Sequence, residues 1–565
     1  MTNKKHELPD VFKDLAKNVI RPPLLYGCGR REDELKRPFV GIANTWTELN
    51  PGHVHLDKIS AKVKEGITKA GLTAFEFNTI APCDGMAEAH EGMRYILPAR
   101  EIIAASIEIM AKVNLLDGLV LIGSCDKIVP GLLMAAARAD IPAIVMPGGY
   151  ALPYCYTSEA FPEEKEFAYP EIGKFVAAWQ GGKISEKELQ KVVQEIFTGP
   201  GACPELGTAM TMQCMAEALG MSLPYTAILP ALSDQQFYFA FEIGERLSYM
   251  IENNITPSKI MTVDAFKNAI SVLLSIGGST NGFLHLPAIA NELNIELPLE
   301  IFDELSEKTP QTCAIKPNGP RAINALQEAG GIPAVMKNLG RSLFLDVMGV
   351  NGKRLGDTLK SVSIYDREVI RPVNDPINPN GGLIVLKGNL SPRGSIVKKS
   401  AVQDKLHTFR GPAKIFESEE AAIGAMLDQE IEPGQCLVIR YEGPRGGPGM
   451  REMAFPGHIL QIFGLGETCA MITDGRFSGT NYGLLVGHIS PEAAEGGPLA
   501  IVRDGDIIEI DLRKKSLNAD LSEGEIRQRL AKWKAPESKY KKGILSWYSK
   551  NVTSAHQGAV LKSGD

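Results

Sequence analysis

Short hydrophobic runs alternate with amphipathic stretches through the first two thirds of the chain. The runs at residues 38–43 and 119–123 are compact and end at glycine or asparagine turns, which is typical of buried strands, and residues 141–146 form a third such run. Residues 100–113 place hydrophobic side chains at helical spacing, and residues 183–197 do the same with more charge. This alternation predicts a parallel sheet with helices on both faces.

The pattern changes at residues 371–382, which contain three prolines, three asparagines and two glycines. So many residues that interrupt regular structure predict a linker, which we place at residues 374–382. Beyond it, short β-like runs recur at 383–386, 411–415, 436–441, 470–473, 499–502 and 507–510. The sequence therefore predicts an α/β domain with a mainly parallel sheet over residues 1–373, followed by a β-barrel-like domain over residues 383–565.

Composition narrows the class of protein. The chain has 565 residues, more than one hydrophobic core usually organises, and its 44% hydrophobic and 22% charged residues exclude a mainly disordered chain. A formal charge of -7 gives no positive field for nucleic acid, so we expect no nucleic-acid partner. The longest nearly uncharged stretch, residues 141–158, contains three prolines and two glycines, so we expect no membrane span.

The cysteine count and the N-terminus bear on location. Nine cysteines are too few for a disulfide scaffold of this size, and their odd number argues against full pairing. The first seven residues lead directly into charged sequence without the apolar segment of a secretory signal, so we expect the mature chain to begin at Met1. Together these features predict a cytoplasmic protein.

Two cysteines stand beside carboxylates after predicted strands. Cys125 is followed by Asp126 and Lys127 at the end of the run 119–123, and Cys83 is followed by Asp84 after an extended run at 75–80. The carboxyl end of a parallel strand is where α/β proteins usually build sites. Burying a thiol, a carboxylate and an amine together is unfavourable unless a metal or a partner charge meets them. An ordinary polar loop is the alternative interpretation.

Cys203 lies in a third loop rich in glycine and proline, ahead of an apolar helix. A helix N-terminus there would favour its thiolate form. Three such loops could hold an iron–sulfur cluster with one iron open, although no short ligand spacing marks one. The remaining cysteines at 155, 214, 313, 436 and 469 are expected to be buried structural thiols.

Two loops of the C-terminal part could also carry chemistry. Residues 441–453 contain four glycines and two prolines, so the backbone could approach an anion, and Glu452 offers a hard oxygen ligand. The loop 473–483 presents Ser478 between small residues. It has neither a Gly-x-Ser-x-Gly elbow nor a neighbouring histidine, which disfavours a hydrolase. A purely structural serine is the alternative.

Taken together, these segments resemble the dihydroxy-acid dehydratase and sugar-acid dehydratase family. The resemblance spans nearly the whole chain and is carried by Asn-Pro-Gly-His-Val-His-Leu at 50–56, Cys-Asp-Lys at 125–127, Gly-Gly-Ser-Thr-Asn at 277–281, Ser-Pro-Glu-Ala-Ala at 490–494, and the segments 442–453 and 474–479. It implies an enzyme that removes water from a small 2,3-dihydroxy carboxylate to give a 2-keto acid. It also implies a two-iron or four-iron cluster beside Mg²⁺ or a similar cation, in a homodimer or a dimer of dimers.

The resemblance also assigns roles to residues of this chain. Cys125 and Cys203 match the cluster ligands, and Asp84, Asp126, Glu452 and a carbamylated Lys127 match the ligands of the hard cation. Carbamylation would turn a cationic amine into an anionic oxygen ligand. Ser478 matches the family's proposed base, which would remove the proton on carbon 2 while the cation stabilises the enolate and an open iron takes the 3-hydroxyl.

The chain departs from the family pattern at two places. Many members have a cysteine where this chain has Gly52, so Cys83 is the candidate for the third cluster ligand. The loop Ser-Gly-Thr-Asn-Tyr-Gly at 478–483 differs from the Ser-Gly-Gly-Thr-Ser-Gly of branched-chain enzymes. The leading hypothesis is the dehydratase of branched-chain amino-acid biosynthesis; the alternatives are an aldonate dehydratase and a non-catalytic iron–sulfur sensor. His53 and His55 could line the site or be structural.

Overall fold

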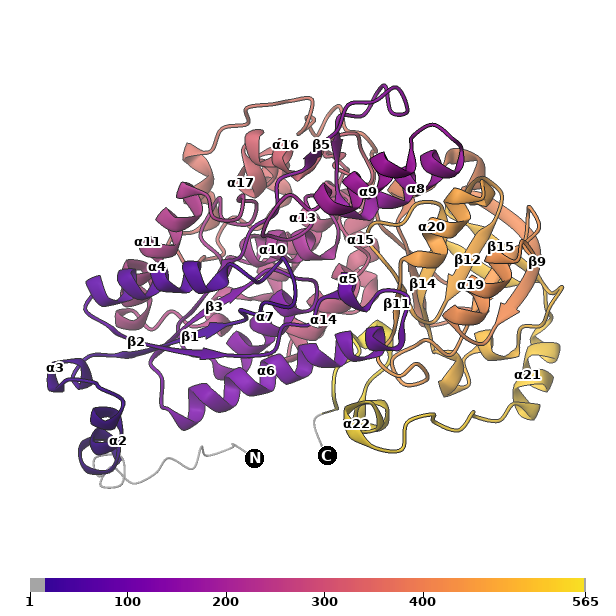
Figure 1. Ribbon diagram of the computed structural model, residues 1–565. Helices are drawn as coiled ribbons and strands as arrows, with labels where there is room; N and C mark the ends of the chain where they lie inside the picture. The colour runs from indigo at the N-terminus through magenta and orange to yellow at the C-terminus, as the bar shows by residue number, and fades with distance from the viewer. Residues whose placement is uncertain (1–15, 563–565) are drawn as a thin grey trace.

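The computed structural model describes residues 16–562, which form an N-terminal α/β part and a C-terminal barrel (Figure 1). The N-terminal part is built on a four-stranded parallel sheet with the order β2-β1-β3-β4. The strands are β1 (Phe39–Asn44), β2 (Thr73–Asn78), β3 (Gly118–Gly123) and β4 (Ala143–Pro147). The predicted strands and the parallel sheet are therefore confirmed.

Helices cover both faces of this sheet. Helices α4 (Leu56–Lys69) and α11 (Asp234–Glu252) pack together on one face, and α6 (Ile96–Val113) and α7 (Ile128–Ala139) pack together on the other (Figure 1). The two helices α4 and α11 approach closely because Gly66 and Gly244 face each other. A Cβ on Gly66 would lie 1.9 Å from the carbonyl oxygen of Phe241, so only glycine permits this contact.

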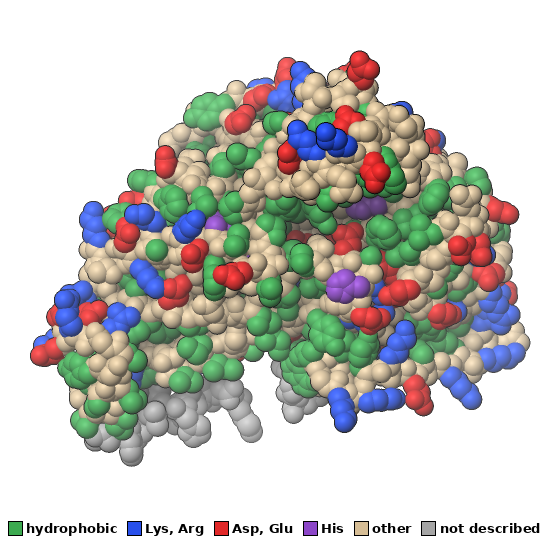
Figure 2. Space-filling model, in the orientation of Figure 1, with side chains coloured by type: hydrophobic (Ala, Val, Ile, Leu, Met, Phe, Trp, Pro, Cys, Tyr) green, Lys and Arg blue, Asp and Glu red, His purple; other side chains and the backbone are tan. Residues whose placement is uncertain are grey.

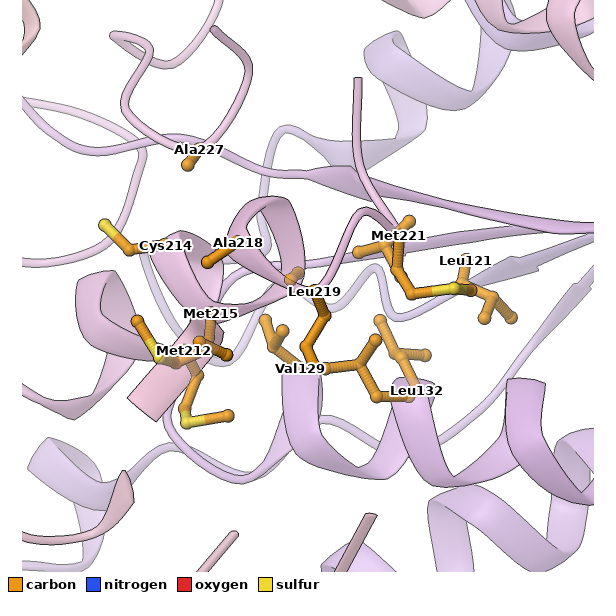
Figure 3. Packing of buried hydrophobic residues seen from close by; sticks show 14 of the residues in the cluster. Leu121, Val129, Leu132, Met212, Cys214, Met215, Ala218, Leu219, Met221 and Ala227 are labelled. Carbon is orange, nitrogen blue, oxygen red and sulfur yellow. The ribbon is translucent and has the colours of Figure 1, made fainter. Parts of the chain in front are cut away.

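The alternation of strands and helices stops after β4, which the sequence pattern did not predict. A group of buried helices follows: α10 (Thr208–Ala218), α13 (Val263–Ile276), α14 (Gly282–Asn291) and α17 (Gly331–Leu339). Every residue of α10 is buried, so its sequence lacks the polar stripe by which an amphipathic helix is recognised. Figure 3 shows Leu219 and Met221, just beyond α10, packed against Val129 and Leu132 of α7 and Leu121 of β3.

The C-terminal part is an eight-stranded mixed sheet that is nearly closed into a barrel. Its order is β16-β15-β9-β10-β12-β14-β8-β7. A bridge between Lys387 and Ser516 joins the two ends, with the Lys387 amide donating to the Lys515 carbonyl at 3.0 Å. The strands are β7 (Ile384–Leu386), β8 (Gly394–Val397), β9 (Thr408–Phe416), β10 (Cys436–Ile439), β12 (Ala470–Thr473), β14 (Leu484–Ser490), β15 (Ile507–Asp511) and β16 (Ser516–Ala519).

Alternation along the barrel strands separates two hydrophobic clusters. In β10, Cys436 and Val438 point into the barrel, whereas Leu437 and Ile439 belong to the outer cluster beneath α19 (Glu419–Leu427) and α20 (Phe455–Ile462). This is the period of two that a strand with both faces buried must satisfy. The barrel-like prediction is therefore confirmed.

One predicted strand is wrong, and three strands were missed. Residues 499–502 were expected to be extended, but Pro498–Ile501 form a 3-10 helix that begins with proline and is largely buried. A short buried hydrophobic run fits either structure, so the pattern could not distinguish them. The missed strands are β8, β14 and β16.

The segment 371–382 contains no helix or named strand, as expected, and Asn378 bridges back to Gln311. The domain boundary at 374–382 remains a prediction. Across residues 16–562, no helix combines the length and the hydrophobicity needed to cross a membrane.

Candidate functional site

The site begins where the loops after β1 and β3 meet at the carboxyl edge of the parallel sheet. The strand order reverses between these two strands, and open α/β sheets bind ligands at such a point. His53, in the loop after β1, accepts a hydrogen bond at Nε2 from the Cys125 amide at 3.2 Å, and its Nδ1 lies 2.8 Å from the Thr45 carbonyl oxygen. Burial lowers the pKa of His53 to about 4, so the neutral ring is the form that can accept. His53 is therefore a structural histidine that holds the Cys125 loop.

The structure brings the three predicted thiols together. Cys83 precedes the short helix α5 (Asp84–Ala87), Cys125 follows β3, and Cys203 lies in the loop before α10. The Cys125 thiol hydrogen-bonds the Cys83 sulfur, which lowers the pKa of Cys83 and raises that of Cys125. Burial, and then the charges of Glu205 and Cys83, raise the pKa of Cys203. The three thiols thus share one buried region.

Gly52 lies against this group of thiols. A Cβ on Gly52 would lie only 2.5 Å from Cys125 Sγ and 3.9 Å from the Gly201 carbonyl oxygen. The position at which the resembling family often has cysteine therefore faces the same sulfur in this chain, and glycine leaves that space to Cys125. All nine cysteines are free, and Cys155 is exposed rather than buried as expected.

The predicted oxygen ligands also converge. One carboxylate oxygen from each of Asp84, Asp126 and Glu452, which we call the acid triad, lies within 4.8 Å of the others. The Lys127 ammonium lies between them, with Nζ 2.5 Å from Asp84 Oδ2, 2.5 Å from Glu452 Oε2 and 3.5 Å from Asp126 Oδ2. Burial and Arg476 disfavour its charge, but the three carboxylates outweigh both and raise the pKa of Lys127.

Glu452 reaches the acid triad through a short pair of parallel strands, β11 (Glu452–Met453) and β13 (Arg476–Phe477). Glu452 lies opposite Arg476, whose guanidinium donates to Glu452 Oε2 at 2.6 Å, and Asn281 donates to Oε1 at 3.1 Å. Arg476 and Asn281 lie in quoted motifs but were given no role, because their partners are distant in sequence. They hold the Glu452 carboxylate in a fixed orientation.

Electrostatics separates the members of the acid triad. Burial raises the pKa of Asp84 to about 8, with repulsion from Asp126 and Glu452 adding to it. Glu452 is also buried, yet Lys127 and Arg476 lower its pKa. Asp84 Oδ1 is buried without a hydrogen-bond partner among the described residues. Several carboxylates with one orphaned oxygen suit a divalent hard cation, and the three thiols suit an iron–sulfur cluster, so both groups fit the residues present.

Ser478 shares a chamber of about 90 Å³ with these residues. Its Oγ accepts hydrogen bonds from the Thr480 hydroxyl at 2.9 Å and the Thr480 amide at 3.3 Å. A recess opens beneath helices α8 (Ile172–Gln180) and α9 (Glu186–Glu195), with acidic and hydrophobic side chains at its floor (Figure 2). The chamber walls include Asp84, Asp126, Cys203, Glu205, Glu452, His458, Ser478 and Thr480.

Comparison with known proteins gives full-length matches. Residues 37–358 match the dihydroxy-acid/6-phosphogluconate dehydratase N-terminal model, and residues 368–559 match the corresponding C-terminal model. The chain is 47% identical to the dihydroxy-acid dehydratase of Caldanaerobacter subterraneus subsp. tengcongensis over 97% of this chain and 99% of that protein. It is 46% identical to that of Ignicoccus hospitalis (94% and 96%) and 45% identical to that of Methanosarcina barkeri (98% and 99%).

Proposed function

Because the chain belongs to the dihydroxy-acid/6-phosphogluconate dehydratase family, we propose that it is a hydro-lyase that converts 2,3-dihydroxy carboxylates to 2-keto acids. Its substrates are 2,3-dihydroxyisovalerate and 2,3-dihydroxy-3-methylvalerate, the precursors of branched-chain amino acids. The observation that carries the proposal is the meeting of Cys203, the acid triad and Ser478 in one small chamber. Relatives named dihydroxy-acid dehydratase, matched over nearly the whole chain, support it.

The acid triad would hold Mg²⁺ or a similar cation, with carbamylated Lys127 as a further oxygen ligand. As a free amine, Lys127 places its positive charge among the three carboxylates and would repel a divalent ion. Reaction with carbon dioxide replaces that charge with an anionic group. When bound, the cation supplies charge that stabilises an enolate, and an iron–sulfur cluster supplies a Lewis acid for the departing hydroxyl.

Cys83, Cys125 and Cys203 would bind the cluster, with Cys83 taking the place left by Gly52. The hydrogen bond between the Cys83 and Cys125 thiols supports this assignment. Iron and sulfide analysis after anaerobic reconstitution tests it: Cys83→Ser should lose most of the iron, whereas Cys155→Ser, at an exposed position, should keep it. Full iron content in Cys83→Ser would refute the third ligand.

Ser478 would act as the base at carbon 2. A free serine hydroxyl is a weak base, so the reaction requires the alkoxide. The two hydrogen bonds that Thr480 donates to Ser478 Oγ favour that charged form. The chamber's small volume holds a short acid and little water beside it.

We further propose a homodimer in the cytoplasm. A surface groove of about 820 Å³, which we call the apolar groove, is lined by the exposed side chains of Leu49, Ile80, Met86 and Tyr95. Hydrophobic side chains gather over α5 and the N-terminal part of α6 in Figure 2. Cys83 also lines this groove, so a second copy seated there would shield the thiols from solvent. Nine free cysteines suit a reducing compartment.

A substrate panel tests the proposed function. Protein reconstituted anaerobically with iron, sulfide and Mg²⁺ would be assayed for keto-acid formation from 2,3-dihydroxyisovalerate, gluconate, xylonate and arabinonate. We expect turnover of 2,3-dihydroxyisovalerate, and its loss in Ser478→Ala. Turnover of sugar acids alone would refute the proposed substrate. A loaded cluster without any keto acid would indicate a non-catalytic iron–sulfur protein.

A further inference from the structure

The chamber continues into a second, larger cavity. An outer cavity of about 630 Å³ lies beside α8 and α20, and it shares the wall residues Pro170, Glu205, His458 and Thr480 with the inner chamber. We call these four residues the neck. Because the acid triad and Cys203 occupy other walls of the inner chamber, the neck is the side on which the tail of a bound acid, its carbons beyond carbon 3, can extend.

Glu205 is a buried carboxyl without a partner. Its side chain is 2% exposed, and Oε1 has no hydrogen-bond partner among residues 16–562. The nearby lysines serve other groups: Lys316 Nζ lies 2.9 Å from both carboxylate oxygens of Glu171, and Lys398 Nζ lies 2.8 Å from the Gly479 carbonyl oxygen. A buried polar group left unpaired lowers stability, so its presence at a chamber wall points to a ligand.

His458 is the second polar side chain of the neck without a partner. It follows the N-terminus of α20, and within the described part of the chain its ring makes no hydrogen bond. Burial lowers the pKa of His458 to about 4, so the ring is neutral and offers one donor and one acceptor. Glu205 and His458 therefore present unused hydrogen-bonding groups to the same opening.

We propose that Glu205 and His458 are specificity-determining residues that bind a hydroxyl group on carbon 4 or beyond of the substrate. This inference rests on the proposed function, because it requires that the acid triad holds the carboxylate end of the acid. A hydroxyl on the tail can donate to Glu205, whereas a purely alkyl tail leaves that carboxyl unpaired in the complex. Sites that hydrogen-bond a substrate group reject analogues without it far more strongly than apolar pockets distinguish alkyl groups.

A matched pair of acids tests this inference on the reconstituted holoenzyme. 2,3-Dihydroxybutanoate and 2,3,4-trihydroxybutanoate differ only in the 4-hydroxyl. We expect kcat/KM to favour the trihydroxy acid by about tenfold or more. Glu205→Leu should reduce the ratio to about one, and Glu205→Gln, which can still accept a hydrogen bond, should keep part of it. His458→Phe should lower the ratio independently.

The control is Glu164→Gln, which lies on the outer cavity away from the neck and pairs with Lys174 at 2.8 Å. It should leave the ratio unchanged. Glu205→Leu should unfold at the same temperature as the natural chain or higher, because it removes an unpaired buried carboxyl. A ratio that is the same in the natural chain and in Glu205→Leu would overturn the inference, as would a large loss of stability in that variant.

Binding separates this inference from the proposed function. Calorimetric titration with 2-hydroxybutanoate and 2,4-dihydroxybutanoate requires no turnover, since neither acid carries a 3-hydroxyl. We expect the dihydroxy acid to bind about tenfold more tightly, and Glu205→Leu to abolish the difference. Absence of turnover on every dihydroxy acid would refute the proposed function, while equal binding of the two analogues by the natural chain would refute the role of the neck.

Discussion

The ammonium of Lys127 lies 2.5 Å from the carboxylate of Glu452, although 325 positions separate the two residues in the sequence. Lys127 precedes α7 of the α/β part, and Glu452 lies on β11, which belongs to the C-terminal half of the chain. The acid triad is therefore complete only when the two halves are packed together. Each half contributes ligands that the other lacks.

The first prediction concerns carbamylation of Lys127. Bicarbonate should raise the Mg²⁺ affinity of the natural chain, because the carbamate replaces a positive charge within the acid triad. Lys127→Arg keeps the charge and cannot form the carbamate, so its Mg²⁺ affinity should stay weak with or without bicarbonate. Titration calorimetry at both bicarbonate levels checks this. Equal bicarbonate dependence in the two proteins would contradict it.

The same lysine has a structural consequence in metal-free protein. Lys127→Met leaves three buried carboxylates without their central cation. Removing one partner of a buried ion pair destabilises a protein by about 3–5 kcal/mol. We therefore expect a clearly lower Tm for Lys127→Met without Mg²⁺, and partial recovery when Mg²⁺ is added. A Tm equal to that of the natural chain would show that the carboxylates do not depend on Lys127.

The second prediction concerns Gly52. In Gly52→Ala the new methyl group would lie 2.5 Å from Cys125 Sγ, so the thiol must move. Because Cys125 is held by His53 through its backbone amide, we expect cluster loading to fall several-fold. Gly199→Ala, which lies in a neighbouring loop with no atom within 4 Å of the added Cβ, is the matched control. Iron content per chain is the measurement, and full loading of Gly52→Ala would be the contrary result.

The third prediction is a pH dependence from Lys398. Burial lowers the pKa of Lys398 to about 7, against 10.5 for an ordinary lysine, while the charge of Glu205 partly opposes this shift. Between pH 7 and pH 10 the unfolded chain thus binds a proton that the folded chain does not, and this group makes stability rise with pH. The contribution is up to about 1.4 kcal/mol per pH unit.

Lys398→Met should lack this contribution. It also loses the hydrogen bond to the Gly479 carbonyl, which lowers its stability by a pH-independent amount. The natural chain should therefore gain stability over the variant as the pH rises from 7 to 9, as measured by denaturant unfolding at each pH. A constant difference between the two proteins would show that Lys398 titrates normally.

The fourth prediction concerns the apolar groove. Met86 is 64% exposed there, and a charge at this position would oppose burial against a second copy. Light scattering should give about twice the 61.2 kDa chain mass for the natural protein and a monomer for Met86→Glu. Tyr365→Glu changes an equally exposed aromatic residue outside the groove and should remain dimeric. A monomeric natural protein would contradict the proposal.

Much of the fold was predictable because its strands follow simple rules. β1, β3 and β4 are fully buried, so their hydrophobic runs stand out, and parallel strands necessarily direct their following loops to one edge. That reasoning placed Cys125 and Cys83 near each other. It failed for α10, where burial on every side removes the periodic signal.

The rest of the site depends on contacts that no local pattern reveals. His53 serves Cys125 across 72 positions, and Arg476 orients Glu452 through a two-residue strand pair. Glu205 is recognisable only once its missing partners are seen. Local sequence indicates which side chains can react, whereas three-dimensional packing decides which of them meet.

The central claim is that the acid triad and the three thiols act together on one hydroxy acid. The most direct measurement is the rate of keto-acid formation from 2,3-dihydroxyisovalerate by cluster-loaded protein stripped of divalent ions and then titrated with Mg²⁺. We predict no product before Mg²⁺ is added, and full activity once about one equivalent per chain is bound. A rate unaffected by removal of the ion, or loaded protein that forms no keto acid at any Mg²⁺ concentration, would contradict the account.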